Sequence, residues 1–219
     1  MSAGTVAIVE RRQTRGEEIA NSVSHGLGLG AAIGAMPILL VANVQNGSSA
    51  SIAGAFVFST TMVLLYFAST LYHALPEGRA KRVFLKIDHG AIYLFIAGSY
   101  TPFALGVLEG AWGWTLFGLV WALAVTGVTL KIFDRLRHPW LSTGLYLLMG
   151  WLALIAAVPL CERMAAGGLL LLVGGGIAYT AGVPFFATDA RVKYGHFIWH
   201  LFVVAGSTCH FLAVLWYAQ

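Results

Sequence analysis

The chain has 219 residues, of which 58% are hydrophobic and only 10% are charged. Soluble domains carry roughly 25% charged residues, so this composition excludes an ordinary soluble protein. The net charge is +4, but the basic residues lie in short segments between apolar runs rather than along one face. This pattern argues against a nucleic-acid-binding protein.

In chain order, a polar N-terminal arm at 1–18 is followed by seven apolar runs, each close to the roughly 20 residues that a membrane-spanning helix needs. The arm lacks the apolar core and the cleavage site of a signal peptide. Because a helix satisfies its own backbone hydrogen bonds in lipid, we expect an all-α membrane protein with a single seven-transmembrane-helix bundle over 19–217. The predicted spans are 19–44, 51–74, 83–108, 112–133, 141–160, 167–187 and 195–217.

The basic residues predict the orientation of these spans. Three lie in the arm, three in the second-to-third connection, three in the fourth-to-fifth and two in the sixth-to-seventh, whereas Arg163 lies in a connection on the other side. Basic connections stay in the cytoplasm. We therefore expect a cytoplasmic N-terminus, an external C-terminus and a multi-pass protein of the plasma or inner cell membrane. The eleven residues are Arg11, Arg12, Arg15, Arg79, Lys81, Arg82, Lys131, Arg135, Arg137, Arg191 and Lys193.

Ionisable residues inside the spans point to function, because each is costly in hydrocarbon unless it has a partner or an ion. His73 ends the second run and Asp88 lies near the start of the third. His196 and His200 open the seventh run and share one helix face, since they are four residues apart. With a rise of 1.5 Å per residue, all four lie within about 10 Å of the cytoplasmic interface. We expect these side chains to converge in one layer.

Three imidazoles with an oxygen ligand or water are the composition of a catalytic-type zinc site. A nearby carboxylate or hydroxyl can orient the rings or the bound water. The alternative is that the histidines are hydrogen-bonded packing residues, which is the better interpretation of a single intramembrane histidine. Three histidines at one depth with Asp88 favour metal. The segment His196-Phe-Ile-Trp-His200 lacks the glutamate of H-E-x-x-H metalloproteases, so Asp88 is the expected base.

Four further histidines have less specific patterns. His89 is balanced between supporting the site and packing, and His25, on the same helix face as Asn21, is expected to support the site. His210 lies fourteen residues beyond His196, about 21 Å away along a helix, so it is expected to pack or to make a separate polar contact. His138 is expected to be solvated in a cytoplasmic connection.

Small residues, prolines and cysteines have structural interpretations. Gly174-Gly175-Gly176 has no accompanying strand or Lys-Ser/Thr, so it predicts close helix packing rather than a phosphate loop. Prolines inside the spans predict kinks that open room for a lipid-sized cavity. Two cysteines are too few for a disulfide framework, and we expect free thiols. These residues are Pro37, Pro102, Pro184, Cys161 and Cys209.

Four spaced motifs together resemble the hemolysin III family, the bacterial branch of the progestin and adipoQ receptor (PAQR) superfamily and a distant relative of the alkaline ceramidases. The likeness covers about residues 16 to 217. The motifs are Glu17-x-x-x-Asn21-x-x-Ser24-His25-Gly26, Ser69-Thr-Leu-Tyr72-His73, Asp88-His89-Gly-Ala-Ile-Tyr93 running into Ala97-Gly98-Ser99-Tyr100-Thr101-Pro102, and His196-Phe-Ile-Trp199-His200 continuing to His210-Phe211.

The resemblance implies a seven-helix fold with a cytoplasmic N-terminus and a Zn²⁺ ion bound by His73, His196 and His200, with Asp88 contacting it through water and Ser69 close by. The function expected is zinc-dependent hydrolysis of a membrane lipid, an amide in particular. Asp88 would be the base, and Ser69 would bond to water or the intermediate. The alternative is a non-enzymatic membrane protein, either a lytic or channel-like haemolysin or a sensor with structural zinc.

Overall fold

The computed structural model describes residues 11–136 and 139–218, and all the regular structure in these ranges is helical. Seven helical segments in the described ranges are long and apolar enough to cross a membrane, which confirms the predicted fold class. The helices are α1 (Arg15–Asn46), α2 (Ser49–Ala74), α3 (Arg79–Pro102) with η1 (Phe103–Leu108), α4 (Gly110–Ile132), α5 (Pro139–Gly150), η2 (Leu152–Ala156), α6 (Ala157–Arg163), α7 (Ala166–Ala187) and α8 (Gly195–Tyr217).

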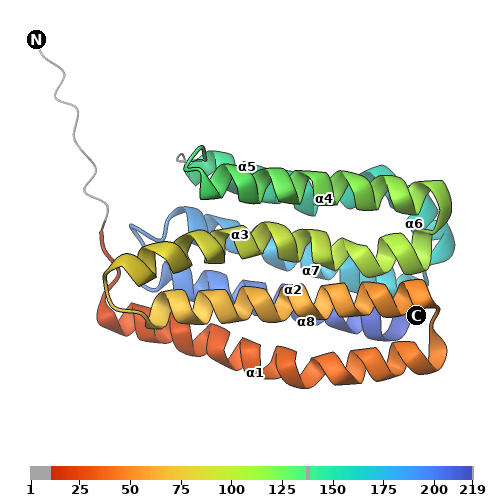
Figure 1. Cartoon of the computed structure of the whole chain (residues 1–219), viewed down its shortest axis with the longest axis horizontal. Coiled ribbons are helices and arrows are strands. Elements are labelled where there is room, and N and C mark those ends of the chain that lie inside the picture. Colours follow the sequence, from red (N-terminus) through yellow and green to blue (C-terminus); the bar gives the residue numbers. More distant parts are fainter. Residues whose placement is uncertain (1–10, 137–138, 219) are drawn as a thin grey trace, which may run out of the picture.

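The helices lie side by side along the long axis of the molecule (Figure 1). One end of this bundle holds the start of α1 and the α2–α3, α4–α5 and α7–α8 connections. It therefore carries the basic residues that were expected to share one side, and we call it the basic end. Arg163, at the end of α6, lies at the opposite end. Arg137 and His138 lie outside the described residues.

The first helix begins at Arg15, four residues before the predicted start of the span. Thr14 caps it: its side chain accepts a hydrogen bond from the Glu17 backbone, and the Glu17 carboxylate in turn accepts one from the Thr14 backbone. This reciprocal arrangement is a capping box. It brings Glu17 and Glu18 into the first turn of α1 and so fixes their positions at the basic end.

The fifth span is broken into three pieces, which the sequence analysis did not predict. Helix α5 ends at Gly150, a 3₁₀ segment follows as η2, and α6 contains Pro159. Proline cannot donate a backbone hydrogen bond to the preceding turn, so a regular helix is interrupted there. The Tyr100 hydroxyl of α3 donates to the Gly150 carbonyl (2.7 Å) and accepts from the Ala153 amide (2.9 Å), which satisfies the backbone at the break.

Helices α7 and α8 pack closely because glycines lie opposite aromatic side chains. A Cβ atom at Gly182 would collide with Trp199 and Phe202, and one at Gly175 would collide with the His210 ring. Gly175 therefore confirms close packing, whereas a Cβ at Gly174 would meet nothing within 4 Å. Small residues that let helix backbones approach are the usual means of association in membranes.

The apolar side chains form two clusters rather than one. The first is centred on α1, α2 and α8 and the second on α4 and the fifth span, and α3 contributes to both. Between them lies a cavity, which the next section describes. The two cysteines, Cys161 and Cys209, are free, as expected.

Candidate metal centre

Three histidines meet at the basic end. His73 comes from the last turn of α2, and His196 and His200 come from the first two turns of α8. One ring nitrogen from each lies within 4.8 Å of the others. Their exposed fractions are only 4, 8 and 1%. The structure thus brings together the three histidines that the sequence predicted to share a layer; we call them the histidine layer.

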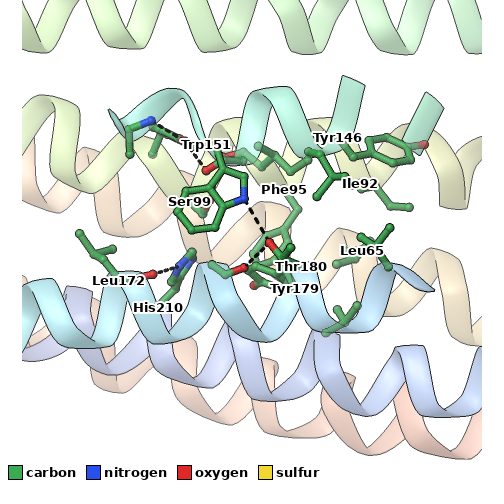
Figure 2. A pocket seen from close by; sticks show the side chains of 18 of the residues that line it. Leu65, Ile92, Phe95, Ser99, Tyr146, Trp151, Leu172, Tyr179, Thr180 and His210 are labelled. Carbon is green, nitrogen blue, oxygen red and sulfur yellow. Dashed lines mark hydrogen bonds between the residues drawn. The ribbon is translucent and has the colours of Figure 1, made fainter. Parts of the chain in front are cut away.

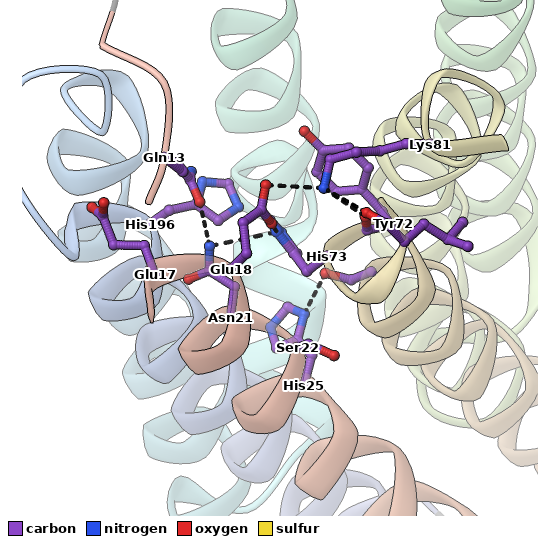
Figure 3. Close-up of polar contacts among 12 residues, drawn as sticks. Gln13, Glu17, Glu18, Asn21, Ser22, His25, Tyr72, His73, Lys81 and His196 are labelled. Atoms are coloured by element: carbon purple, nitrogen blue, oxygen red, sulfur yellow. Dashed lines mark hydrogen bonds and ion pairs between the residues drawn. The ribbon is translucent and has the colours of Figure 1, made fainter. Parts of the chain in front are cut away.

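Carboxylates hold two of these rings by Nδ1. His73 Nδ1 lies 2.7 Å from Glu18 Oε2 (Figure 3). His196 Nδ1 lies 2.8 Å from Asp189 Oδ2. Because a carboxylate accepts, each Nδ1 carries the proton and each Nε2 keeps its lone pair. His73 Nε2 is buried, and no atom of the described residues forms a hydrogen bond with it. It has the lone pair and the burial expected of a metal ligand.

The third ring is held by oxygens of α1. His200 Nδ1 lies 3.2 Å from the Asn21 carbonyl and 3.1 Å from Ser24 Oγ. All three rings therefore face an oxygen acceptor at Nδ1, which leaves Nε2 for a metal. Metal-binding histidines almost always have such a partner, which fixes the tautomer and the ring orientation. The residues present fit a zinc ion, since neutral imidazole is a good zinc ligand.

Glu18 and Asp189 are site residues that the sequence analysis missed. Glu18 also pairs with Lys81 Nζ at 2.9 Å, and Lys81 donates to the backbone carbonyls of Tyr72 and Leu75 at the end of α2 (Figure 3). Glu18 had been assigned to the polar arm. Asp189 lies in the connection before α8, where nothing but its distance of seven residues from His196 could have indicated the pairing.

A strap formed by residues 11–14 closes over the same end. Arg11 makes a two-pronged ion pair with Glu17 (2.6 and 2.7 Å) and also approaches the carbonyls of Asp189 and Val192 at 3.4 Å. The hydrogen bond to Glu17 raises the pKa of Arg11 above its ordinary value. Glu17 further accepts from the Tyr194 amide at 2.8 Å. The strap thus ties α1 to the connection that carries Asp189.

Asp88 and Ser69 lie beside the histidine layer but are not part of it. Asp88 is 6% exposed and lines the same cavity as His196 and His200. Its carboxylate is not among the atoms that lie within 4.8 Å of one another. Ser69 interacts with Asp88 and also lies 2.8 Å from His25 Nδ1. Their predicted roles as base and hydrogen-bonding group are taken up below.

Of the remaining described histidines, His25 lies at the site, whereas His89 and His210 make other contacts. The His25 ring stacks on His200 with 3.5 Å between ring centres, so His25 lies at the site, where it was expected to give support. The backbone carbonyl of His89 accepts from the Tyr146 hydroxyl at 3.1 Å, and its ring lies against Phe186. His210 lies far along α8 and makes a separate polar contact with the Leu172 carbonyl.

A cavity of about 290 Å³ leads from the histidine layer into the bundle. It begins at Asp88 and His196 and extends to Leu160 and Cys161 near the opposite end. Most of its lining is aliphatic or aromatic, as Figure 2 shows for its middle part. Along α3 and into η1 it extends from Asp88 to Phe103, fifteen residues or about 22 Å. Its length and lining suit an extended apolar chain.

Comparisons with known proteins agree with the motifs. The model of a family described as "Haemolysin-III related" matches residues 13–211. Hemolysin-3 of Bacillus cereus is 42% identical over 92% of this chain and 91% of that protein. The Hemolysin-3 homolog of Bacillus subtilis is 43% identical over 92% of this chain and 94% of that protein. The human Monocyte to macrophage differentiation factor is 28% identical over 73% of this chain and 68% of that protein.

The match covers the transmembrane bundle except the last residues of α8, and it includes the three histidines, Ser69 and Asp88. Together with the seven spanning helices, it is consistent with a multi-pass protein of the cell membrane. The chain therefore belongs to the haemolysin-III related family, within the PAQR superfamily.

Proposed function

We propose that this protein is a zinc-dependent hydrolase that cleaves an amide bond in a membrane lipid, and that its basic end faces the cytoplasm. The observation that carries the proposal is a layer of three buried histidines at the mouth of a long apolar cavity. Such a cavity can hold a lipid chain, and the histidine layer can hold the ion that activates the bond at the head of that chain.

Three imidazoles and one open position are the ligand set of catalytic zinc sites, whereas structural zinc sites have four protein ligands. Within the described residues the group contains three histidines and no fourth ligand. Zinc bound by His73, His196 and His200 would lower the pKa of water to about 7 and polarise a carbonyl group. His73, His196 and His200 would hold the ion, and Asp88 lines the cavity together with His196 and His200.

The chain's own residues supply the proton transfers. Asp88 would accept a proton from the attacking water and pass it to the leaving amine, which is general base and then general acid catalysis. Ser69 lies between His25 and Asp88, and its hydroxyl donates to the Asp88 carboxylate. Once Asp88 has taken the proton of the water, the Ser69 hydroxyl would be free to donate to the carbonyl oxygen, where negative charge develops. The apolar cavity would hold the acyl chain and keep bulk water from the site.

The cytoplasmic orientation rests on charge. Among the described residues, the arm and the connections at the basic end hold most of the lysines and arginines, and Arg163 lies at the other end. Segments rich in lysine and arginine are retained in the cytoplasm during insertion. A tag placed at each terminus, tested for protease access in intact cells, checks this orientation.

The names of the most similar relatives, Hemolysin-3, favour a second candidate function, the lysis of membranes without catalysis. A pore needs a polar path through the bilayer, whereas this cavity is mainly apolar and most of its ionisable groups lie at one end. A non-catalytic sensor with structural zinc would also keep the histidine layer, but it has no need of a carboxylate facing the cavity.

The test begins with metal analysis of the detergent-purified protein. We expect close to one zinc per chain, and zinc should be lost from His200→Ala, because two histidines hold zinc poorly. His210→Phe, which is about 21 Å away along α8, should keep its zinc. The two variants change the same residue type on the same helix, so they separate loss of a ligand from general damage.

The activity test uses ceramide-like and phospholipid substrates in mixed micelles. Asp88→Asn should keep its zinc but lose at least about 100-fold in rate, the usual contribution of a positioned base. If zinc-loaded wild-type protein released no more product than His200→Ala, the hydrolase proposal would be wrong. Lysis of erythrocytes that tracks expression without any lipid product would favour the second candidate instead.

A further inference from the structure

The far half of the cavity contains a histidine that the proposed reaction does not use. His210 lines the cavity from α8, fourteen residues or about 21 Å along the helix from His196. Its neighbours in the cavity wall include Tyr179 and Leu172 of α7 (Figure 2). An ionisable side chain at this depth in a membrane is costly, so it calls for a partner.

The hydrogen bonding of His210 identifies the atom that needs a partner. Its Nε2 atom lies 3.4 Å from the Leu172 carbonyl oxygen. A carbonyl oxygen only accepts, so Nε2 carries the proton and Nδ1 of the neutral ring is an acceptor. This Nδ1 atom is buried, and no donor within residues 11–136 or 139–218 pairs with it. A buried acceptor left unpaired is a substantial cost.

Tyr179 provides a complementary group beside this acceptor. Its ring packs edge-on against the His210 ring, with 5.4 Å between ring centres. Its hydroxyl is also buried and forms no hydrogen bond with the described residues. The Ser207 hydroxyl lies near the Tyr179 hydroxyl and interacts with it, but without the geometry of a hydrogen bond, and Ser207 donates instead to the Val203 carbonyl and contacts the Tyr66 hydroxyl. Tyr179 therefore has a proton to donate.

The rings of His210 and Tyr179 each pack against a glycine of the opposite helix. The His210 ring lies over Gly175 of α7, where a Cβ atom would collide with it. The Tyr179 ring lies over Gly206 of α8 in the same way. The two glycines allow these rings to fit between α7 and α8 at the cavity wall. An apolar cavity that needed only to hold a hydrocarbon tail would have no use for such a pair of unpaired polar groups.

We propose that His210 and Tyr179 form a second polar subsite, which binds a hydroxyl group on the tail of a lipid whose head lies at the histidine layer. A hydroxyl would donate to His210 Nδ1 and accept from the Tyr179 hydroxyl, so it satisfies both atoms at once. A carboxylate has no proton to give Nδ1, and a methyl group satisfies neither atom. The inference rests on the proposed function in that the same cavity holds the chain.

The test compares the binding of palmitate and ω-hydroxypalmitate to the zinc-loaded protein in detergent. The extended length of ω-hydroxypalmitate is close to the axial separation of His196 and His210. We expect wild-type protein to bind ω-hydroxypalmitate about tenfold more tightly than palmitate, which is about 1.4 kcal/mol. Isothermal titration, or displacement of a fluorescent fatty acid, measures both affinities.

Two variants test whether His210 and Tyr179 cause the preference for ω-hydroxypalmitate. His210→Phe keeps an aromatic ring over Gly175 but removes Nδ1, so it should bind both chains alike while its affinity for palmitate stays within about twofold of wild type. Tyr179→Phe removes one hydroxyl and should lower the preference to about threefold. Tyr146→Phe is the matched control, because it removes a hydroxyl from the cavity wall near His89. It should leave the preference unchanged.

The outcomes separate this inference from the function on which it rests. Equal binding of the two chains to wild-type protein overturns the subsite and leaves the lipid-binding cavity intact; it would indicate that a water molecule satisfies His210 instead. A preference that survives in both variants also overturns the subsite. If neither chain binds, the subsite and the proposed lipid cavity both fall. If gel filtration shows that His210→Phe does not fold, Tyr179→Phe is the deciding variant: an unchanged preference for ω-hydroxypalmitate in it would overturn the subsite.

Discussion

The two ends of the cavity use histidine in opposite ways. At the basic end, oxygens hold Nδ1 of His73, His196 and His200, and the three rings converge. At the far end, a carbonyl holds Nε2 of His210, and Nδ1 of this ring is left without a partner. Whether a buried histidine suits a metal or a hydroxyl thus depends on which nitrogen the protein occupies and on whether other rings share its space.

The two ends are also held together by different forces. Carboxylates join separate segments at the basic end: Glu18 and Glu17 form ion pairs with Lys81 and Arg11, and Asp189 accepts a hydrogen bond from His196. Farther along, α7 and α8 are joined by glycines packed under aromatic rings. Changes at the basic end should therefore affect metal affinity and depend on salt, whereas changes along α7 should affect stability and depend little on salt.

The largest effect should follow from removing the oxygen partner of a ligand ring. In Asp189→Asn the amide can present its NH₂ group to His196 Nδ1, so the ring is no longer held in the orientation that points Nε2 at the metal. Loss of such a partner typically costs 10–100-fold in metal affinity, and we expect a loss of about that size. Competition with a zinc chelator measures it.

Glu77→Gln is the matched control, because Glu77 is an exposed carboxylate at the same end. Its zinc affinity should equal that of wild type. Equal affinities for Asp189→Asn and Glu77→Gln would contradict the role given to Asp189, and would mean that the histidine rings are oriented by packing alone.

The residues that sequence reasoning found and missed differ in what fixes their positions. His73, His196 and His200 could be placed together because helix rise and membrane topology set their depth. Glu18 and Asp189 could not, because their partners depend on the path of the chain outside the spans. His25 could be assigned to the right end, but its stacking on His200 depends on how α1 rotates against α8.

The fold likewise has features that the sequence predicted and one that it did not. Apolar runs of sufficient length identified all seven spans, because lipid leaves the backbone few alternatives to a helix. The break after Gly150 was missed, although Gly150 and Pro159 were both visible in the sequence. What makes the break tolerable is the Tyr100 hydroxyl, fifty residues away, and such a contact is set by tertiary packing.

An intermediate effect is expected along α7. Gly182→Ala places a Cβ against Phe202 Cβ and the Trp199 ring; the first of these atoms is fixed to the backbone and cannot rotate away. Overpacking of this kind costs about 1–3 kcal/mol, and the melting temperature in detergent should fall accordingly. Gly174→Ala is the control on the same helix, with nothing within 4 Å of its new Cβ.

Because alanine favours helix by up to about 1 kcal/mol over glycine, Gly174→Ala should melt at or slightly above the wild-type temperature. The difference between the two variants should persist in high salt, since no charge is involved. If the two variants melted alike, the close approach of α7 and α8 would not contribute to stability, and the contrast between the two ends would fail.

The smallest effect is expected from Arg11→Lys, which leaves the charge of the strap but removes the two-pronged contact with Glu17. Arg11 does not touch the histidine layer. It acts through Glu17 and through the Asp189 and Val192 carbonyls, which belong to the connection that holds His196. Zinc should therefore leave the variant about two- to threefold faster than wild type, with the stoichiometry unchanged, because lysine keeps the charge and Arg11 is partly exposed to solvent, which screens the pair. Salt weakens such pairs, so the difference between the variant and wild type should shrink as ionic strength rises. Arg12→Lys, on the neighbouring exposed residue, should release zinc at the wild-type rate. A salt-independent difference, or the same rate in both variants, would mean that the strap only covers the site and does not help to hold Asp189 against His196.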